Sequence, residues 1–351
     1  MKRFKSIVVA ALVAVITISS VAPGLMVAAQ SSASLSIVPK KNYTVEPGRT
    51  IKDTLTIRNL DADAPLELSL RVVDFTYTDD SGTPKLMLAE DAPQTTWSLK
   101  PFLDLPETVT IEPRSSKTVD LSVAIPANQG AGSYYSAIVY ASGAPEGGNV
   151  GLSASGVTLV FTSVPGEVNE DLQLEKFGAY NVAKTGKEAG YTFLSTLKPE
   201  TMAYTLKNNG NVTEAPVGTI TLRHMFGQEI EIDNVNPNQS LALVGQTRTF
   251  TACIKLKAQE VEFNGTRAQS TQCATPDLWP GIYTATINLF YGQNGNRTQE
   301  ITGSATFIYL PLWFIIVLAV VIGFIGYVAF RITSKVKSKR RGSRKRSARR
   351  R

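Results

Sequence analysis

Few residues of this chain could carry out chemistry, and their types and spacing restrict what that chemistry would be. His224 is the only histidine among 351 residues, so paired-histidine metal sites and histidine relays cannot form. The chain also lacks the HExxH and GxSxG patterns and a glycine-rich phosphate loop. An extracellular hydrolase would need a general acid and a general base, and no such pair can be named. The sequence therefore predicts a non-enzymatic protein without a cofactor, with His224 in a structural role.

The two cysteines, Cys253 and Cys273, are the remaining candidates for reactive side chains. A cysteine nucleophile would need a neighbouring base, whereas two cysteines in an oxidising compartment most simply form one bridge. A bridge would close the polar insertion 254–272 and stabilise the fold by ~3 kcal/mol in the chain-entropy model. We therefore predict a disulfide between Cys253 and Cys273.

Paired carboxylates in loops offer the only metal chemistry that the sequence suggests. Asp61 with Asp63, and Asp79 with Asp80, could supply oxygen ligands to Ca²⁺. Ordinary turn chemistry explains both pairs more simply, so no metal site is predicted. Glycosylation is left open, because its meaning depends on the secretory route. The Asn-x-Ser/Thr sites are Asn42, Asn211, Asn238, Asn264 and Asn296.

An uncharged segment of 24 residues, 307–330, lies near the C-terminal end of the chain. A helix needs roughly 20 apolar residues to cross ~30 Å of hydrocarbon, so the segment predicts a transmembrane helix. Tyr309 and Trp313 would mark one membrane interface and Tyr327 the other, because amphipathic rings collect at that depth. A buried core helix is the alternative, and the basic residues that follow the segment disfavour it.

The charges beside this segment predict its orientation. Arg331 follows at once, and residues 331–351 hold 12 of the 36 Lys and Arg residues and no acid. Positive charge beside a spanning helix predicts a cytoplasmic tail and an exterior position for everything before residue 307. The tail should attract anionic lipid, at about 1 kcal/mol per charge near the surface. Contact of the tail with nucleic acid or an acidic protein is the disfavoured alternative.

The first residues, 1–29, have the pattern of a secretory signal. Three basic residues precede the apolar stretch 7–18, and the small residues 27–29 offer a cleavage site. A retained anchor is less favoured, because Ser, Pro and Gly interrupt the apolar stretch. Without this leader and the tail, 21 basic residues face 29 acidic ones, a net charge of about −8 with no nucleic-acid footprint. The sequence thus predicts a single-pass protein of the cell membrane with an extracellular N-terminal part.

Between the two apolar ends, short segments alternate polar and apolar residues with a period of two. About seven such segments fill residues 33–166, and a second set fills residues 167–306. Turn signals at regular spacing are typical of immunoglobulin-type sandwiches. We therefore expect an all-β fold of two tandem immunoglobulin-like β-sandwich domains plus one C-terminal transmembrane α-helix. A short acidic junction at 165–171 predicts some motion between the domains.

Three motifs carry a resemblance to a known family. A Pro-Gly turn at 47–48 precedes the strand TLTIRNL, and PANQGAGSYYSAIV precedes a glycine-rich gap. With the signal, these resemble the WxL-interacting surface proteins of Gram-positive bacteria. Residues 208–211, 216–218, Ile220 and 226–227 are similar to a common bacterial surface module. The resemblance implies two immunoglobulin-like domains, one transmembrane helix, a basic tail, and binding of peptidoglycan or a partner surface protein through the first domain.

The first domain is therefore where we expect the ligand to bind. Residues 74–106 carry Tyr77, Trp97 and Phe102 as aromatic candidates for ligand contact, and the glycine-rich loop after Tyr140 is a second candidate. The expected partner is a cell-wall polymer or another surface protein. The alternative is an accessory subunit of a membrane export or assembly complex, acting through its helix and basic tail.

Overall fold

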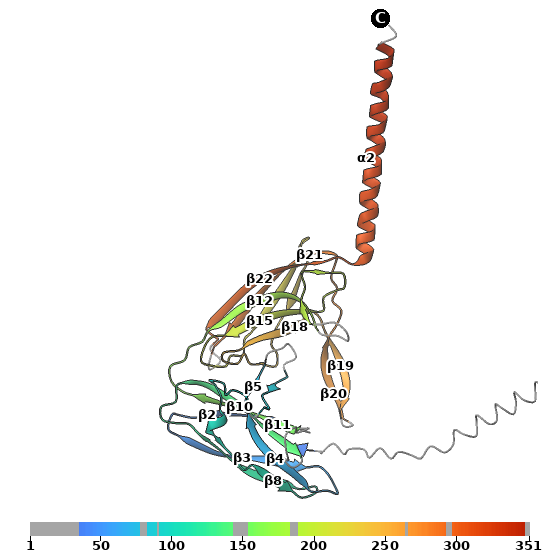
Figure 1. Ribbon diagram of the computed structural model, residues 1–351. Coiled ribbons are helices and arrows are strands. Elements are labelled where there is room, and N and C mark those ends of the chain that lie inside the picture. The colour runs from blue at the N-terminus through green and yellow to red at the C-terminus, as the bar shows by residue number, and fades with distance from the viewer. Residues whose placement is uncertain are drawn as a thin grey trace, which may run out of the picture.

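The computed structural model describes residues 35–77, 83–89, 91–142, 154–182, 189–263, 266–292 and 297–347. These residues form mostly strands, and one long helix, α2 (Leu312–Ser347), ends the chain (Figure 1). The expected all-β class with a C-terminal apolar helix is confirmed. The predicted signal, residues 1–29, and the glycine-rich loop after Tyr140 lie outside the described residues.

The N-terminal sandwich consists of two sheets that enclose an apolar core. Its four-stranded sheet has the order β1 (Leu35–Ser36), β3 (Thr50–Asn59), β9 (Ser116–Ala124) and β7 (Leu103–Asp104). Its five-stranded sheet has the order β2 (Lys40–Thr44), β11 (Ala154–Val164), β10 (Gly132–Ser142), β4 (Leu66–Val73) and β8 (Thr108–Ile111). The connection from β4 to β7 contains a short strand pair, β5 (Phe75–Thr76) with β6 (Lys85–Leu86), and the 3-10 helix η1 (Lys100–Phe102).

The C-terminal sandwich repeats this arrangement around a second core. Its four-stranded sheet has the order β13 (Gly190–Tyr191), β12 (Leu172–Asn181), β15 (Thr201–Asn208) and β18 (Thr247–Cys253). Its five-stranded sheet has the order β14 (Leu194–Ser195), β22 (Gln299–Tyr309), β21 (Gly281–Tyr291), β16 (Val217–His224) and β17 (Glu229–Ile232). In both sandwiches a short strand pairs in parallel with the last long strand, β2 with β11 and β14 with β22.

The alternation in the sequence explains how each strand divides its side chains. In β3, Leu55 and Ile57 are buried in the core, whereas Thr54 and Thr56 between them are exposed. Successive side chains of a strand point to opposite faces of the sheet, so this pattern buries one face and solvates the other. The sandwich core is the consequence, because each sheet can cover its apolar face only with the other sheet.

Each sandwich contains the same tyrosine hydrogen bond at the start of an equivalent strand. The hydroxyl of Tyr134, in β10, donates to the carbonyl of Gly130 at 2.9 Å, and that of Tyr283, in β21, donates to the carbonyl of Trp279 at 3.0 Å. A tyrosine bonded to the backbone just upstream at this place is a mark of immunoglobulin-type sandwiches. The described strands therefore have features of an immunoglobulin-like β-sandwich fold.

The predicted disulfide is present and closes an insertion of the C-terminal sandwich. Cys253 ends β18, and Cys273 ends the second strand of a hairpin formed by β19 (Leu256–Phe263) and β20 (Thr266–Cys273). The two Cα atoms are 5.0 Å apart across a separation of 20 residues. The bridge therefore fixes the base of this hairpin to the sandwich.

The helix begins later than the uncharged segment of the sequence does. Phe307 and Tyr309 belong to β22 and are buried in the core of the C-terminal sandwich, opposite Tyr283 and Gly281 of β21. Placing Tyr309 at the membrane interface was therefore wrong, because strand pairing and core packing take its side chain into the protein. Apolar residues at the end of a buried strand and at the start of a spanning helix look alike in sequence.

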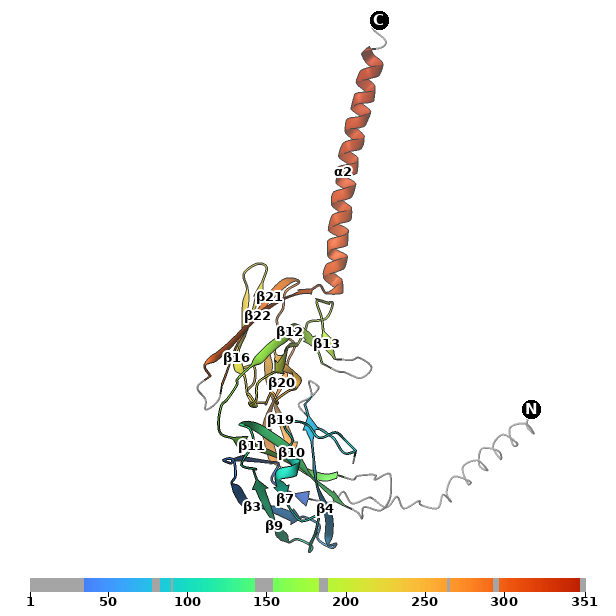
Figure 2. The same ribbon diagram turned by 60° about the vertical axis from the view of Figure 1, so that its left-hand side comes forward.

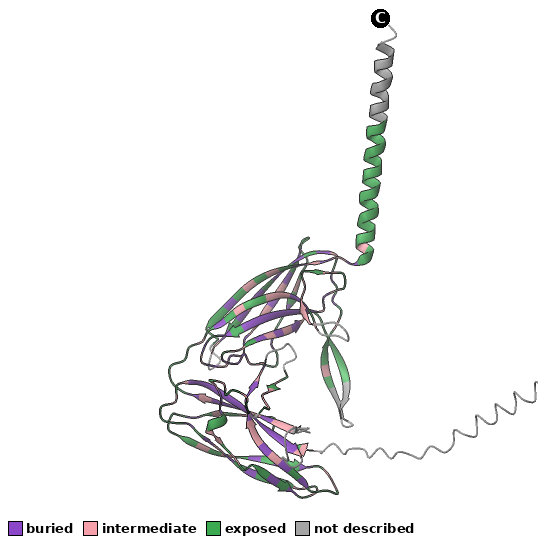
Figure 3. Ribbon diagram, viewed as in Figure 1, coloured by how far each residue is buried: buried purple, intermediate pink, exposed green. Residues whose placement is uncertain are grey.

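The part of α2 that could cross a membrane is Leu312–Ser334, with a mean hydropathy of 2.7. The most apolar stretch of this part is not buried inside the protein, so the helix does not pack on a sheet (Figure 3). Trp313, Tyr327 and Arg331 lie on it, with the Arg331 guanidinium 5.8 Å from the ring centroid of Tyr327. The helix continues past Arg331 to Ser347, so no break separates the apolar part from the basic tail.

The two sandwiches contact each other through hydrogen bonds to fixed backbone groups. The Asn211 backbone carbonyl accepts the Ser133 N–H at 2.8 Å, and the Asn211 side-chain amide donates to the Ala131 carbonyl at 3.1 Å. The approach is so close that a Cβ at Gly132 would collide with the Asn211 carbonyl oxygen and would lie 2.9 Å from the Trp97 ring. Only glycine fits there, since its φ of 145° is also disfavoured for other residues.

Gln246 makes the most extensive side-chain link between the sandwiches. Its Oε1 accepts the Tyr77 N–H at 2.9 Å, and its Nε2 donates to the Tyr135 hydroxyl at 3.0 Å and the Phe75 carbonyl at 3.5 Å. Leu243 is fully buried in the same cluster of apolar side chains. Polar and apolar contacts therefore hold the two sides of the junction together.

We predict that Gln246→Ala lowers the free energy of unfolding by about 1–2 kcal/mol, because it removes three hydrogen bonds at a partly buried site. Urea denaturation of the full-length protein in detergent measures this change. Gln228→Ala is the matched control, since Gln228 is exposed in the turn between β16 and β17. Equal effects of the two substitutions would contradict the assigned role of Gln246.

Candidate functional site

A groove on the N-terminal sandwich is the candidate site. It encloses about 600 Å³ and is open to solvent along the edge where β7 ends beside β9. Polar residues dominate its lining, which includes one lysine and three aspartates. The lining residues are Lys52, Asp53, Thr54, Asp104, Leu105, Pro106, Asp120, Leu121 and Ser122. The groove therefore combines charges of both signs on a rigid sheet.

The groove follows a partly unpaired strand edge. Strand β7 pairs with β9 through Leu103 with Val123 and Asp104 with Ser122, and then turns away at Leu105 and Pro106. In the described part of the chain, no other strand pairs with that edge of β9. An exposed strand edge offers a row of backbone donors and acceptors to an extended ligand. The groove therefore lies beside backbone groups of β9 that are available for hydrogen bonds.

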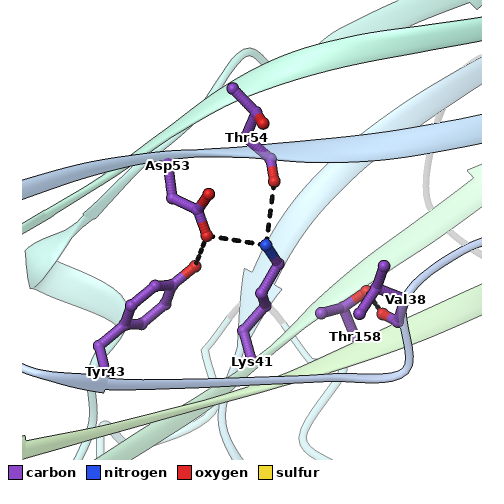
Figure 4. A network of polar contacts seen from close by, with 6 residues as sticks. All are labelled: Val38, Lys41, Tyr43, Asp53, Thr54 and Thr158. Carbon is purple, nitrogen blue, oxygen red and sulfur yellow. Dashed lines mark hydrogen bonds and ion pairs between the residues drawn. The ribbon is translucent and has the colours of Figure 1, made fainter.

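Asp53 forms one wall of the groove and belongs to a cluster of three polar side chains (Figure 4). Its Oδ2 accepts a hydrogen bond from Lys41 Nζ at 2.7 Å and another from the Tyr43 hydroxyl at 2.7 Å. Lys41 also donates to the Thr54 carbonyl at 3.1 Å. Lys41 and Tyr43 lie on β2, the edge strand of the opposite sheet, so the cluster ties the two sheets together beside the groove.

The cluster also fixes the ionisation of its members. Hydrogen bonds from Lys41 and then from Tyr43 lower the pKa of Asp53 to about 2, because both stabilise the carboxylate. Burial, and then the hydrogen bond to Asp53, raise the pKa of the Tyr43 hydroxyl. The Asp53 carboxylate is thus paired on the inner face of β3, the face of Leu55 and Ile57, whereas Asp104 and Asp120 are exposed at the rim of the groove. The rim carboxylates are therefore the acidic side chains of the groove that face solvent.

The three aromatic residues proposed from the sequence for ligand contact do not gather in this groove. Tyr77 is buried, and its ring lies 4.3 Å from the Arg248 guanidinium of the C-terminal sandwich. Trp97 and Phe102 are partly buried, with ring centroids 5.6 Å and 6.1 Å from that of Tyr134. Their contacts are internal, so the structure places all three in packing roles.

A buried carboxylate explains why the segment carrying Trp97 is ordered against the sandwich. Asp74 accepts hydrogen bonds from the Ser98 hydroxyl at 2.7 Å, the Ser136 hydroxyl at 3.0 Å and the Thr95 N–H at 3.0 Å. Buried carboxylates need such donors to offset the loss of water. Asp74 was not singled out from the sequence, since nothing local marks an aspartate after a strand as buried.

The remaining candidates for chemistry have structural environments. His224 is buried, and its Nε2 lies 3.3 Å from the Pro280 carbonyl. Asp61 accepts the N–H groups of Asp63 and Ala64, which is turn chemistry. Among the described residues, no group of three or more His, Cys, Asp or Glu side chains could hold a metal ion. Asp79 and Asp80 lie outside the described residues.

Glu214 is a buried acid that the sequence reading missed. Burial, and then the charge of Glu170, raise its pKa to about 7. Perturbed acids are enriched at functional sites, so its surroundings matter. Its Oε2 accepts the N–H of Gly292 at 3.2 Å, and its backbone pairs with Ala242. The side chain therefore holds the turn after β21 instead of facing a groove.

No protein-family model and no curated protein matches the chain. Among solved structures, it is similar to the class 5 fimbriae chaperone CfaA, with 13% identity, a TM-score of 0.35, and coverage of 79% of this chain and 100% of that one. It is also similar to the E. coli chaperone DraB, with 12% identity, a TM-score of 0.32, and coverage of 79% and 98%. The Pseudomonas aeruginosa CupB2 chaperone gives 7% identity, a TM-score of 0.28, and coverage of 75% and 96%. Such scores carry no argument about function.

We predict that Asp53→Asn destabilises the protein by about 1 kcal/mol at pH 7, after allowance for the partial exposure of the pair. The folded pKa of Asp53, about 2, lies below its ordinary value of 3.8. The stabilisation is therefore present above about pH 4 and is lost as the pH falls towards 2. Urea denaturation between pH 2.5 and 7 measures this dependence.

Asp120→Asn is the matched control, because Asp120 is exposed on the same groove. It should leave the free energy of unfolding unchanged over this pH range. If Asp53→Asn kept the pH dependence of the wild-type protein between pH 2.5 and 4, the paired carboxylate would not be its source.

Proposed function

We propose that this protein is a non-enzymatic, membrane-anchored surface protein with two tandem immunoglobulin-like domains. It binds a partner through the groove of its N-terminal sandwich. The proposal rests on one observation. Contacts connect α2 to the C-terminal sandwich, and further contacts connect that sandwich to the N-terminal sandwich that carries the groove. Only residues 310–311 separate β22 from the helix, and the Leu310 N–H donates to the Ser195 carbonyl at 2.9 Å. The interface of Gln246, Asn211 and Gly132 then continues the connection to the N-terminal sandwich.

This arrangement suits display better than it suits chemistry. The helix leaves the C-terminal sandwich at the end opposite the N-terminal sandwich (Figures 1 and 2). A membrane around α2 therefore places the groove of Asp104 and Asp120 on the far side of the molecule from the bilayer. The basic residues after Arg331 support a cytoplasmic tail that contacts anionic lipid, and an extracellular position of the sandwiches. We expect no nucleic-acid partner.

The groove favours an extended partner that carries both amino and carboxyl groups. Lys52 can pair with a carboxylate, while Asp104 and Asp120 can pair with amines. A peptidoglycan-like cell-wall polymer with its peptide branches has these groups, and so does a strand of another surface protein. Membership of the WxL-interacting family is consistent with either partner and remains part of the proposal.

Reversing two rim charges tests the binding site. We predict that the double variant Asp104→Lys with Asp120→Lys binds at least about tenfold more weakly to isolated cell walls or to intact cells, because it repels amines. The probe is the purified full-length protein in detergent, and pull-down measures binding. Glu231→Lys with Asp233→Lys is the control, since both residues are exposed on the C-terminal sandwich. Equal binding by the two double variants would remove the groove as the site.

The alternative function, an accessory subunit of an export or assembly complex, makes the helix itself the contact. Replacing residues 312–351 by an unrelated spanning helix with a basic tail separates the two functions. A display protein should keep its binding to cell walls or cells after the exchange, to within about twofold, because the groove is unchanged. Loss of binding with the sandwiches still folded and exported would instead support the subunit role.

A further inference from the structure

Seven large apolar side chains are exposed at the end of the C-terminal sandwich from which α2 leaves. They lie in three short segments, 193–197, 225–226 and 279–282, which we call the apolar collar. Phe226 is 81% exposed, Leu197 is 71% exposed and Trp279 is 68% exposed. Soluble surfaces seldom gather several such residues at one end, so the collar needs something to cover it.

Hydrogen bonds connect all three segments to the last residues of β22. The Ile308 N–H donates to the Phe193 carbonyl at 2.7 Å, and Ile308 pairs with Ile282. The Met225 N–H donates to the Ile282 carbonyl at 2.9 Å, which places the turn with Phe226 beside the same strand end. Helix α2 begins only four residues after Ile308, at Leu312. The collar therefore lies at the end of the sandwich where the helix begins.

Its position and composition together identify what covers it. The three segments contain no charged residue, whereas Lys198 and Asp277 lie just outside them. Any bilayer that surrounds α2 from Leu312 must have its headgroup layer at the depth of the residues just before it. Tryptophan is favoured at that depth, because its amphipathic ring suits a boundary between water and hydrocarbon. Phenylalanine and leucine bury their apolar side chains at the boundary between headgroups and acyl chains.

We propose that the apolar collar is a lipid-binding surface that sits in the outer headgroup–acyl boundary. The C-terminal sandwich thus rests on the membrane instead of standing clear of it. This inference rests on the proposed membrane anchoring through α2. Trp279 is the central contact, and Phe226 and Leu197 enter the same layer on either side. Residues 310–311 connect β22 to α2. This short connection and the lipid contacts together hold the C-terminal sandwich at a fixed tilt on the bilayer.

Fluorescence quenching by lipids brominated close to the headgroup tests the proposal in the full-length protein, reconstituted in nanodiscs. The chain has three tryptophans, of which Trp97 lies in the N-terminal sandwich and serves as an internal reference. Three variants are compared: Trp313→Phe, Trp279→Phe and the double variant. We expect quenching of Trp313→Phe to be at least about twofold greater than that of the double variant, because Trp279 reaches the lipid.

The outcomes separate this inference from the anchoring on which it rests. One outcome would overturn the proposed collar but keep the membrane anchor. In it, the fluorescence of Trp279→Phe is quenched, through Trp313, while Trp313→Phe is quenched no more than the double variant. A collar that serves a protein partner instead of lipid gives the same result. Absence of quenching in Trp279→Phe would show that α2 is not in the bilayer, and both proposals would fall.

A second pair of variants asks whether the collar itself sets the depth of Trp279. In the Trp313→Phe background, Phe226→Asp should lower the quenching of Trp279, since a charge at that depth is costly. Phe290→Asp is the matched control, because Phe290 is partly exposed at the opposite end of β21. Equal quenching in the two variants would contradict the placement of Phe226 in the lipid.

Discussion

The close approach of two backbones at Gly132 and Asn211 is the constraint on which the arrangement of the molecule depends. Within each sandwich, the strands form hydrogen bonds with one another. Between the sandwiches, the turn that begins β10 forms hydrogen bonds with the turn that follows β15. Buried backbone groups cost free energy when unpaired, so separating the sandwiches would expose or orphan several of them at once. The junction is therefore held by polar geometry, and the apolar cluster around Phe75 and Leu243 fills the space that remains.

This constraint explains why Tyr77, which the sequence suggested for ligand contact, is unavailable for it. Tyr77 and Arg248 come from different sandwiches and meet face to face, which uses the tyrosine ring and buries the guanidinium. Tyr77 and Arg248 therefore help to join the two sandwiches. What remains for a partner on the N-terminal sandwich is a polar groove with a strand edge, which is a surface typical of extended ligands.

The sequence predicted those features that depend on local pattern. Alternation identified the strands, because a period of two is imposed by the pleat. The presence of two cysteines, Cys253 and Cys273, in a segment expected to be exported identified the disulfide. The end of β22 was misread, since Phe307 and Tyr309 are as apolar as the helix that follows them. The groove could not be predicted at all. Asp53 meets Lys41 across two sheets, and only the way those sheets face each other brings the two side chains together.

The two ends of the C-terminal sandwich have opposite physical characters, and this difference gives the molecule its direction. At one end, backbone hydrogen bonds and the side chains of Gln246 and Asn211 join it to the N-terminal sandwich. At the other end, uncharged segments with Trp279 and Phe226 are exposed on the side of the sandwich where an exposed apolar helix begins. A surface that is polar and paired suits contact with protein, while one that is apolar and unpaired suits contact with lipid. In the proposed display function, the C-terminal sandwich is thus a spacer between the bilayer and the N-terminal sandwich, and its length sets how far the groove stands from the membrane.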